Sequence, residues 1–340
     1  MTTLVGPPAA APAPDPQDVP RDIDPGRTRA DRVFFASARS IGGLVLLITG
    51  SIGLFLGVQL IPTLHRYGFS FFTEQQWNPE RNIIGIAAVL VGTVSVALIA
   101  LIIGFPLALG VALYVSEYAP PRLKGLLVSL LDLMVAVPSI VYGLCGLFLL
   151  EPRIIYLSRW LHTYLGWIPI FHVETDPHAA AWEQTRYYSS AFIAGVVVSL
   201  MVIPMAAAVM RGVFSQTPIG EREGALALGA TRWGVIRAVV LPFGRGGIIG
   251  GTMLGLGRAL GETIAVTLII SIEFLIKPRI LEVGTVTTSS LIATLFGEAT
   301  SAQLSALLAA GFVLFMMTLV VNTLAAVIVT RSRSGAATEI

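Results

Sequence analysis

Six long apolar runs constrain this chain more strongly than any other feature of its sequence. A helix rises about 1.5 Å per residue, so about 20 residues are needed to cross the hydrocarbon core of a bilayer. Each run is long enough to cross the membrane once, and none is long enough to cross it twice. We therefore predict an all-α polytopic membrane protein with six transmembrane helices, at residues 41–64, 83–114, 126–150, 190–210, 246–272 and 304–329.

Composition supports the membrane class and argues against several others. Apolar residues make up 55% of the chain and charged residues only 12%, which leaves too little polar surface for a water-soluble domain. The net charge of +2 is too small to indicate binding to nucleic acid. The single cysteine, Cys145, can form no disulfide within the chain, so cysteine usage does not indicate a redox compartment.

The two ends of the chain differ from its middle. Residues 1–40 are rich in proline, alanine and charged residues, a composition that cannot bury a core, so we expect a disordered tail. We do not expect a signal peptide, because the apolar run that follows is too long and no small-residue cleavage site is evident beyond it. We predict a transmembrane domain at residues 41–330 and a short second tail at residues 331–340.

The positions of lysine and arginine indicate the orientation. Cytoplasmic loops of membrane proteins carry an excess of these cations, whereas acidic residues contribute little. With six spans, the side that holds the N-terminal tail carries roughly twice as many of the 22 cations as the opposite side. We therefore predict a protein of the cell membrane with both termini in the cytoplasm.

The sequence shows no enzyme active site. A nucleotide-binding P-loop needs Gly-Lys followed by Ser or Thr, but the only lysines, Lys124 and Lys277, precede Gly and Pro. No nucleophile motif is present either. The histidines all fall in predicted outer loops, which leaves no histidine-based metal site within the membrane: His65, His162, His172 and His178. We predict a chain that is not an enzyme and has no catalytic residue, no metal site and no cofactor of its own.

A cytoplasmic loop at residues 214–243 has the pattern of a helical hairpin. Glu223 begins a short predicted helix, and an acidic residue in the first turn is favoured by the helix dipole. Gly229 can end this helix in a left-handed conformation. A second short helix is predicted at residues 231–240, and Pro242 starts the next segment. Composition alone is also that of an ordinary amphipathic loop, so the spacing of the residues carries the argument below.

The fifth run has one face of small residues and one of large apolar residues. Steps of three and four along a helix place four glycines on one face, where they let another helix approach closely: Gly244, Gly247, Gly251 and Gly255. The opposite face is purely apolar and is expected to meet lipid: Ile249, Met253, Leu256, Leu260 and Ile264.

Two charges, Arg258 and Glu262, continue the glycine face near the middle of the same run. A central arginine costs about 2.5–3.5 kcal/mol on insertion scales, so its charge must be offset. On a continuous helix the two side chains are neighbours, four residues apart. Two interpretations stay open: the pair only neutralises itself, or Arg258 meets a passing anion while Glu262 orients it. Asp132 in the third run is a weaker pathway candidate, and a structural hydrogen-bonding role is equally open for it.

The outer loop at residues 151–188 is rich in aromatic side chains, among them Trp160, Tyr164, Trp167 and Trp182. Aromatic residues at the ends of spans are usually anchors at the membrane–water interface, in contact with lipid. A contact with an extracytoplasmic partner protein is the alternative.

The loop at residues 214–243 closely resembles the EAA loop of ABC importer permeases, which is written EAA-x3-G-x9-I-x-LP. Five residues fall on this pattern in register: Glu223, Ala225, Gly229, Leu241 and Pro242. Gly224 and Val239 depart from it by small changes. The resemblance implies a type I importer permease fold, with a five-helix core plus an N-terminal helix. It also implies that the loop docks on a separate ATPase subunit, which binds the ATP.

Beyond residue 40, most of the chain resembles the permeases of the Pst phosphate importer, and the C-type more than the A-type. The carrying segments are Phe71–Pro79, Gly104–Pro120 and Arg258–Thr263. This resemblance implies inorganic phosphate as the substrate. It also implies three kinds of partner: a PstA-type second permease, a PstB-type ATPase dimer and a PstS-type phosphate-binding protein.

Alternatives remain at this point. Sulfate, molybdate and phosphonate importers share the EAA loop, so another oxyanion is possible as the substrate. A secondary transporter would show internal repeats and would leave the loop unexplained. A membrane-embedded enzyme would need the metal ligands or the nucleophile that the sequence lacks.

Overall fold

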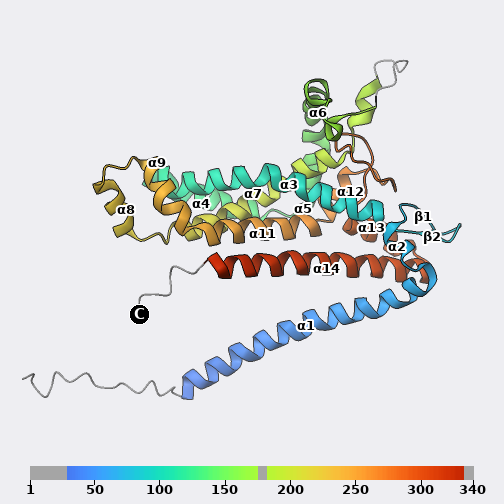
Figure 1. Cartoon of the computed structure of the whole chain (residues 1–340), viewed down its shortest axis with the longest axis horizontal. Coiled ribbons are helices and arrows are strands. Elements are labelled where there is room, and N and C mark those ends of the chain that lie inside the picture. The colour runs from blue at the N-terminus through green and yellow to red at the C-terminus, as the bar shows by residue number, and fades with distance from the viewer. Residues whose placement is uncertain (1–28, 175–181, 333–340) are drawn as a thin grey trace, which may run out of the picture. The chain divides into compact units, whose positions relative to one another are not determined.

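The computed structural model describes residues 29–174 and 182–332, which form helices for most of their length (Figure 1). The longest helices are α1 (Arg29–Tyr67), α3 (Ala87–Leu113), α7 (Ala191–Phe214), α11 (Arg245–Gly261) and α14 (Ser301–Ser332). The shorter ones are α2 (Ser70–Thr73), α4 (Pro121–Ala136), α5 (Ser139–Cys145), α6 (Glu151–Leu165), α8 (Ile219–Ala227), α9 (Arg232–Val235), α10 (Leu241–Phe243), α12 (Ile264–Ile269) and α13 (Thr288–Leu295).

Short turns and one small hairpin complete the description. The π-helical turns are η1 (Tyr114–Tyr118), η2 (Gly146–Leu150) and η5 (Ile236–Val240), and the 3-10 turns are η3 (Pro169–Phe171), η4 (Trp182–Tyr187) and η6 (Phe296–Glu298). Strands β1 (Trp77–Asn78) and β2 (Ile83–Ile84) pair antiparallel, with Trp77 opposite Ile84. The chain divides into two compact units, residues 1–52 and 53–340.

The number of described helices that can cross a membrane is five, or six if one bent pair counts as a single span, a range that includes the predicted six. By length and apolar composition, five described helical segments qualify: Arg29–Tyr67, Ala87–Tyr118, Ser139–Leu165, Ala191–Phe214 and Ser301–Thr330. A sixth candidate is a bent pair, Arg232–Phe243 and Arg245–Gly261, whose two parts meet at 69°.

The first span begins earlier than predicted. α1 starts at Arg29, so residues 29–40 are helical and do not belong to a disordered tail. At the other end, α14 continues to Ser332, two residues into the predicted second tail. Residues 1–28 and 333–340 lie outside the described residues, and the predictions for them stay predictions.

The third predicted span, residues 126–150, is not one continuous helix. α4 ends at Ala136, Val137 is extended with ψ 128°, and α5 begins after Pro138. Proline disfavours helical geometry in the residue before it and removes one backbone donor, which explains the break. The Tyr142 hydroxyl donates a hydrogen bond of 2.9 Å to the Met134 carbonyl and so bridges the two pieces.

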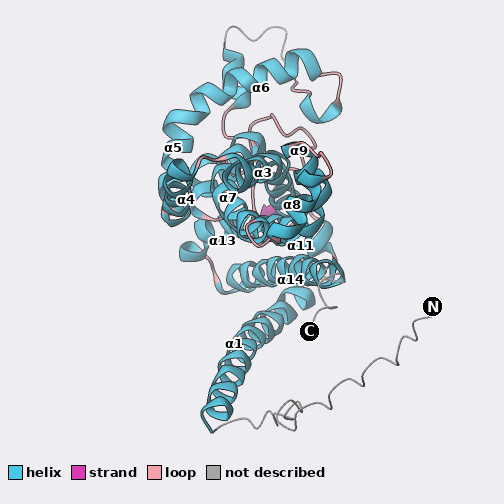
Figure 2. Ribbon diagram, turned by 90° about the vertical axis from the view of Figure 1, so that its left-hand side faces the viewer, coloured by secondary structure: helices cyan, strands magenta, loops and turns pink. Residues whose placement is uncertain are grey.

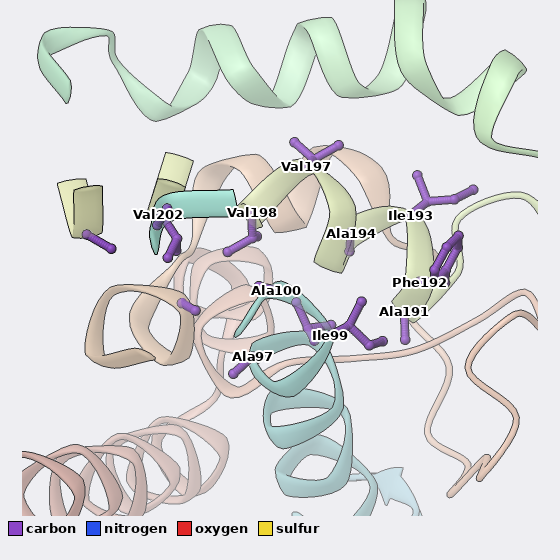
Figure 3. Packing of buried hydrophobic residues seen from close by; sticks show 14 of the residues in the cluster. Ala97, Ile99, Ala100, Ala191, Phe192, Ile193, Ala194, Val197, Val198 and Val202 are labelled. Atoms are coloured by element: carbon purple, nitrogen blue, oxygen red, sulfur yellow. The ribbon is translucent and has the colours of Figure 1, made fainter. Parts of the chain in front are cut away.

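α7 is the centre of the main hydrophobic core. Figure 2 shows it enclosed by α3, α4 and α11, and each of these helices contacts it. The α3–α7 contact uses small and β-branched side chains, which allow two helices to pack closely. Figure 3 shows part of this cluster, with Ala97, Ile99 and Ala100 on α3 and Ile193, Ala194, Val197, Val198 and Val202 on α7.

The glycine face of α11 packs directly on α7, as the sequence predicts for a small-residue face. A Cβ atom added at Gly247 would lie 2.5 Å from the Val213 side chain, and one at Gly255 would lie 2.6 Å from Val202. Real Cβ atoms essentially never come this close. The opposite face does not meet lipid along its whole length, because Leu260 is only 4% exposed. α14 also packs along α11.

We predict that α11 tolerates no side chain on this face. Gly247→Leu should destabilise the folded chain by about 1–3 kcal/mol, the usual cost of overpacking a close-packed contact. Gly250→Leu is the matched control, because a Cβ there has no atom within 4 Å. Thermal unfolding of the purified chain in detergent checks the pair. Equal stability of the two variants would contradict the close contact.

Candidate functional site

The fifth predicted span breaks at the glutamate that the sequence placed in mid-helix. α11 ends at Gly261, Glu262 is extended (φ −67°, ψ 125°), and α12 begins at Ile264. The Glu262 carboxylate accepts a hydrogen bond of 3.4 Å from the Ala265 amide. A helix start leaves such amides without partners, so the carboxylate caps α12. Arg258 and Glu262 are therefore not neighbours on one continuous helix, and no ion pair joins them among the described residues.

The polar groups at this break are satisfied by a cluster of buried hydroxyls on α13. The Ser289 hydroxyl donates to the Glu262 carbonyl (2.6 Å), and the Thr288 amide donates to the Thr93 hydroxyl of α3 (2.9 Å). Thr287 and Ser290 form a capping box at the start of α13. Within a bilayer no water replaces missing backbone partners, so the bond from Ser289 supports the break, while the other hydroxyls satisfy the start of α13.

The two broken spans meet each other. A Cβ added at Gly143 of α5 would lie 2.9 Å from the Cα of Ala265, so α5 and α12 are in close contact. One break lies at Val137–Pro138 and the other at Glu262–Thr263. We call residues 137–143 and 258–265 the broken-span site. Irregular backbone at membrane depth occurs where it is buried in protein or lines a water-filled path, which makes this region the candidate functional site.

Arg258 is the exposed charge of the broken-span site. It lies in the last turn of α11 and forms no ion pair and no side-chain hydrogen bond among the described residues. Its charge acts on the hydroxyl of Tyr142 on α5. A guanidinium without a partner is costly next to lipid, so it must meet water, another protein chain or an anion.

Other cations that follow the broken-span site are paired instead. In the segment after α12, Lys277 lies 2.7 Å from the Glu273 carboxylate and Arg279 lies 2.7 Å from the Glu174 carboxylate. The hydrogen bond from Arg279, together with its charge, lowers the pKa of Glu174 below its usual value. Glu282 adds a second carboxylate 3.7 Å from Arg279. These cations are neutralised locally, in contrast to Arg258.

Asp132 is exposed on α4 and forms no ion pair among the described residues. The structure brings Arg258 and Tyr142 within electrostatic reach but does not link Asp132 to either of them. The role of Asp132 stays a prediction.

The loop at residues 214–243 forms the predicted helix–glycine–helix hairpin. Gly229 has φ +84°, which confirms its left-handed conformation, and Thr231 caps α9 by accepting a hydrogen bond of 3.1 Å from the Gly234 amide. α8 begins at Ile219, earlier than predicted, so Glu221 lies in its first turn and Glu223 does not. The dipole argument for Glu223 is therefore wrong.

The remaining residues of the EAA pattern divide between the bundle and the surface. Ala225 and Leu241 pack on the main core, whereas Glu223 and Pro242 are exposed. The structure thus leaves the Glu223 carboxylate available to a partner protein.

Sequence reasoning missed α13 and the breaks, although the signals were present. Val137–Pro138 is a helix-ending dipeptide, and Thr-Thr-Ser-Ser at residues 287–290 is typical of a helix start. Val137–Pro138 lies inside a long apolar run, and residues 287–290 lie in a predicted outer loop, so neither changes the pattern of apolar runs from which spans are predicted.

The outer helix α6 exposes an aromatic face. Trp160 is 52% exposed and Tyr164 64% exposed, and their ring centroids lie 5.2 Å apart. Arg153 and Arg159 are also exposed, and the only carboxylate of the helix, Glu151, is buried. Figures 1 and 2 show that α6 projects away from α3 and α7. Aromatic residues with arginines and without exposed carboxylates favour the lipid interpretation over the protein contact.

We predict that Trp160 lies at the membrane–water interface. With Trp160 as the only tryptophan, its fluorescence should be quenched by lipids brominated near the headgroup. Trp233 of the cytoplasmic hairpin, 57% exposed, is the matched single-tryptophan control and should be quenched less. A photocrosslinker at position 160 that captures only protein, together with unquenched fluorescence, would contradict the lipid contact.

Comparisons with known proteins agree with this geometry. Two solved ABC transporters share the fold: the MetNI methionine transporter in inward-facing conformations (TM-score 0.51, 13% identity, 76% of this chain and 99% of that chain), and a bacterial importer of the acidic polysaccharide alginate (TM-score 0.55, 16% identity, 89% and 96%). These likenesses confirm the predicted all-α permease fold of type I ABC importers.

Curated relatives are much closer in sequence. The chain is 37% identical to phosphate transport system permease protein PstC 2 of Mycobacterium tuberculosis, over 89% of this chain and 93% of that protein. It is 38% identical to PstC of Xylella fastidiosa, over 85% and 86%, and 37% identical to PstC of Haemophilus influenzae, over 90% and 95%. The family described as binding-protein-dependent transport system inner membrane component matches residues 104–334. The chain is therefore a multi-pass permease subunit that belongs to this family of inner-membrane transport components.

Proposed function

We propose that this chain is the C-type permease of an importer for inorganic phosphate, and that Arg258 is the cation its anion meets on the way through. The PstC relatives support the substrate assignment. The observation that carries the pathway assignment is the exposed guanidinium of Arg258 beside two broken spans, without an ion pair among the described residues.

The chemistry of arginine suits this role. A guanidinium is permanently charged and planar, and its parallel N–H groups match two oxygens of a tetrahedral oxyanion. A cation that is already paired with a carboxylate attracts an anion less strongly. Arg258 is not held in this way, because Glu262 caps α12 with its carboxylate. The anion gains a partner there that replaces part of its hydration.

The proposal includes the partners of this permease. A PstA-type permease would complete the path, a PstB-type ATPase dimer would bind the ATP, and a PstS-type protein would deliver phosphate from outside. In this arrangement both termini lie in the cytoplasm, on the side of the arginine-rich hairpin, as the positive-inside rule requires. The exposed Glu223 would contact the ATPase.

The pathway prediction concerns Arg258. Arg258→Met should insert and assemble but lower phosphate uptake by more than about tenfold, because no planar cation remains to meet the anion. Arg258→Lys should also be impaired, since an ammonium lacks the planar fork. Uptake of labelled phosphate, divided by the amount of assembled complex, measures both effects.

Glu262 separates the pathway role from a structural role. Glu262→Gln keeps an oxygen that can accept from the Ala265 amide, so it should keep substantial uptake and normal assembly. Glu262→Leu removes the cap and should destabilise the folded chain by about 1 kcal/mol, the usual cost of a lost cap. The amount of assembled complex should fall as a result.

Normal uptake by Arg258→Met would contradict the pathway assignment.

The coupling prediction concerns the hairpin. Glu223→Lys should leave the complex assembled but abolish the ATP hydrolysis that transport stimulates, because it reverses a charge that we assign to the ATPase contact. Glu221→Lys is the matched control: it loses about 0.3–1 kcal/mol of helix-dipole interaction and should keep that hydrolysis. Gly229→Val forces a β-branched residue into a left-handed conformation at about 1–3 kcal/mol and should behave like Glu223→Lys. Stimulated hydrolysis at the normal rate in both test variants would overturn this assignment.

A further inference from the structure

One guanidinium connects three separate elements at the cytoplasmic end of the bundle. Arg222 of α8 contacts both carboxylate oxygens of Glu117, which lies in η1 at the end of α3, at 3.1 and 3.2 Å. The same guanidinium donates to the Phe214 carbonyl at the end of α7, at 2.7 Å. The side chains of Arg222 and Glu117 are only 25% and 12% exposed. The Nη1–Oε2 contact is a hydrogen bond and the Nη2–Oε1 contact is an ion contact only. Because the pair is largely shielded from water, it is held more firmly than an exposed ion pair.

The rest of α8 is attached to the bundle only loosely. Its more extensive contacts are with α9 and η5, the second half of the same hairpin. Most of its side chains are exposed, including Ile219 at 71% and Leu226 at 51%. Ala225, with a single methyl group, is the apolar residue that α8 packs on the main core. Arg222 therefore provides the directional contact between this helix and the ends of α3 and α7.

The ends of α3 and α7 lead directly to the core and to α11. Phe214 is fully buried, and a Cβ added at Gly244 would lie 2.3 Å from its ring, so the end of α7 packs against the start of α11. α11 runs from there to Arg258. When Arg222 transmits a displacement of α8 to η1 and Phe214, the displacement therefore reaches the helices that hold the broken-span site.

We propose that the Arg222–Glu117 ion pair is the link through which movement of α8 reaches α3 and α7. Both residues are positioning residues that act on the path through these helices. The inference rests on the proposed function only in assigning the driving force on α8 to a partner ATPase. Coupling of this kind requires a contact that persists while the helix moves, and a shielded charge pair whose guanidinium also bonds the Phe214 carbonyl provides one.

The test uses the full transporter reconstituted in liposomes, with both permeases, the ATPase dimer and the binding protein. Arg222→Gln and Glu117→Gln should assemble and hydrolyse ATP, but the phosphate moved per ATP should fall by about tenfold or more, because the multidentate link is lost. The charge exchange Glu117→Arg/Arg222→Glu should regain a substantial part of that ratio. Arg122→Gln is the matched control, because it removes another exposed cytoplasmic cation five residues from Glu117 and should leave the ratio unchanged.

A purely structural role gives a different result: less assembled complex and a lower melting temperature at an unchanged ratio of phosphate to ATP, which would overturn the link. A second measurement does not depend on the substrate. Spin labels at Gly220 on α8 and Tyr118 in η1, in a Cys145→Ala background, should keep one mutual distance with and without ATP. In Arg222→Gln that distance should change on ATP binding, and an unchanged distance would overturn the link. Failure of the wild-type complex to move phosphate would refute the proposed function alone.

Discussion

The close contact between α11 and α7 is the constraint on which the rest of the structure depends. In a bilayer, helices gain little from the hydrophobic effect when they associate, so they rely on close van der Waals packing of small residues. Gly247, Gly251 and Gly255 supply that surface on α11, and Val202, Ala206 and Val213 face them on α7. Because α7 is also the centre of the main core, this contact fixes α11 relative to the other spans.

The α7–α11 pair positions both the hairpin and the broken-span site. At one end, the Phe214 ring packs against Gly244. The backbone carbonyl of Phe214 accepts a hydrogen bond from Arg222 of the hairpin. At the other end, α11 presents Arg258 and stops at the break before α12. The closely packed α7 and α11 therefore connect the hairpin to the broken-span site.

The breaks themselves follow from backbone hydrogen bonding. Each break exposes amides and carbonyls that lipid cannot satisfy. Ser289 and the Glu262 carboxylate supply partners at one break, and Tyr142 supplies one at the other. The cations Lys277, Arg279 and Arg222 have carboxylate partners, whereas Arg258 has none among the described residues.

The sequence by itself determined the membrane class, the hairpin with its left-handed Gly229 and the small-residue face of α11, but not the breaks in two of the predicted spans. These features depend on local composition and spacing, and both can be read within a single segment of the chain. Only the tertiary structure decided that α7 is the partner of that face, that Ser289 donates to the Glu262 carbonyl, and that Arg222 pairs with Glu117, 105 positions away in the chain. Such pairings depend on which helices meet in space, and helical periodicity gives the face of a residue but not the neighbour across it. Arg258 and Glu262 are not neighbours because α11 ends at Gly261 and Glu262 is extended, whereas the prediction assumed one continuous helix.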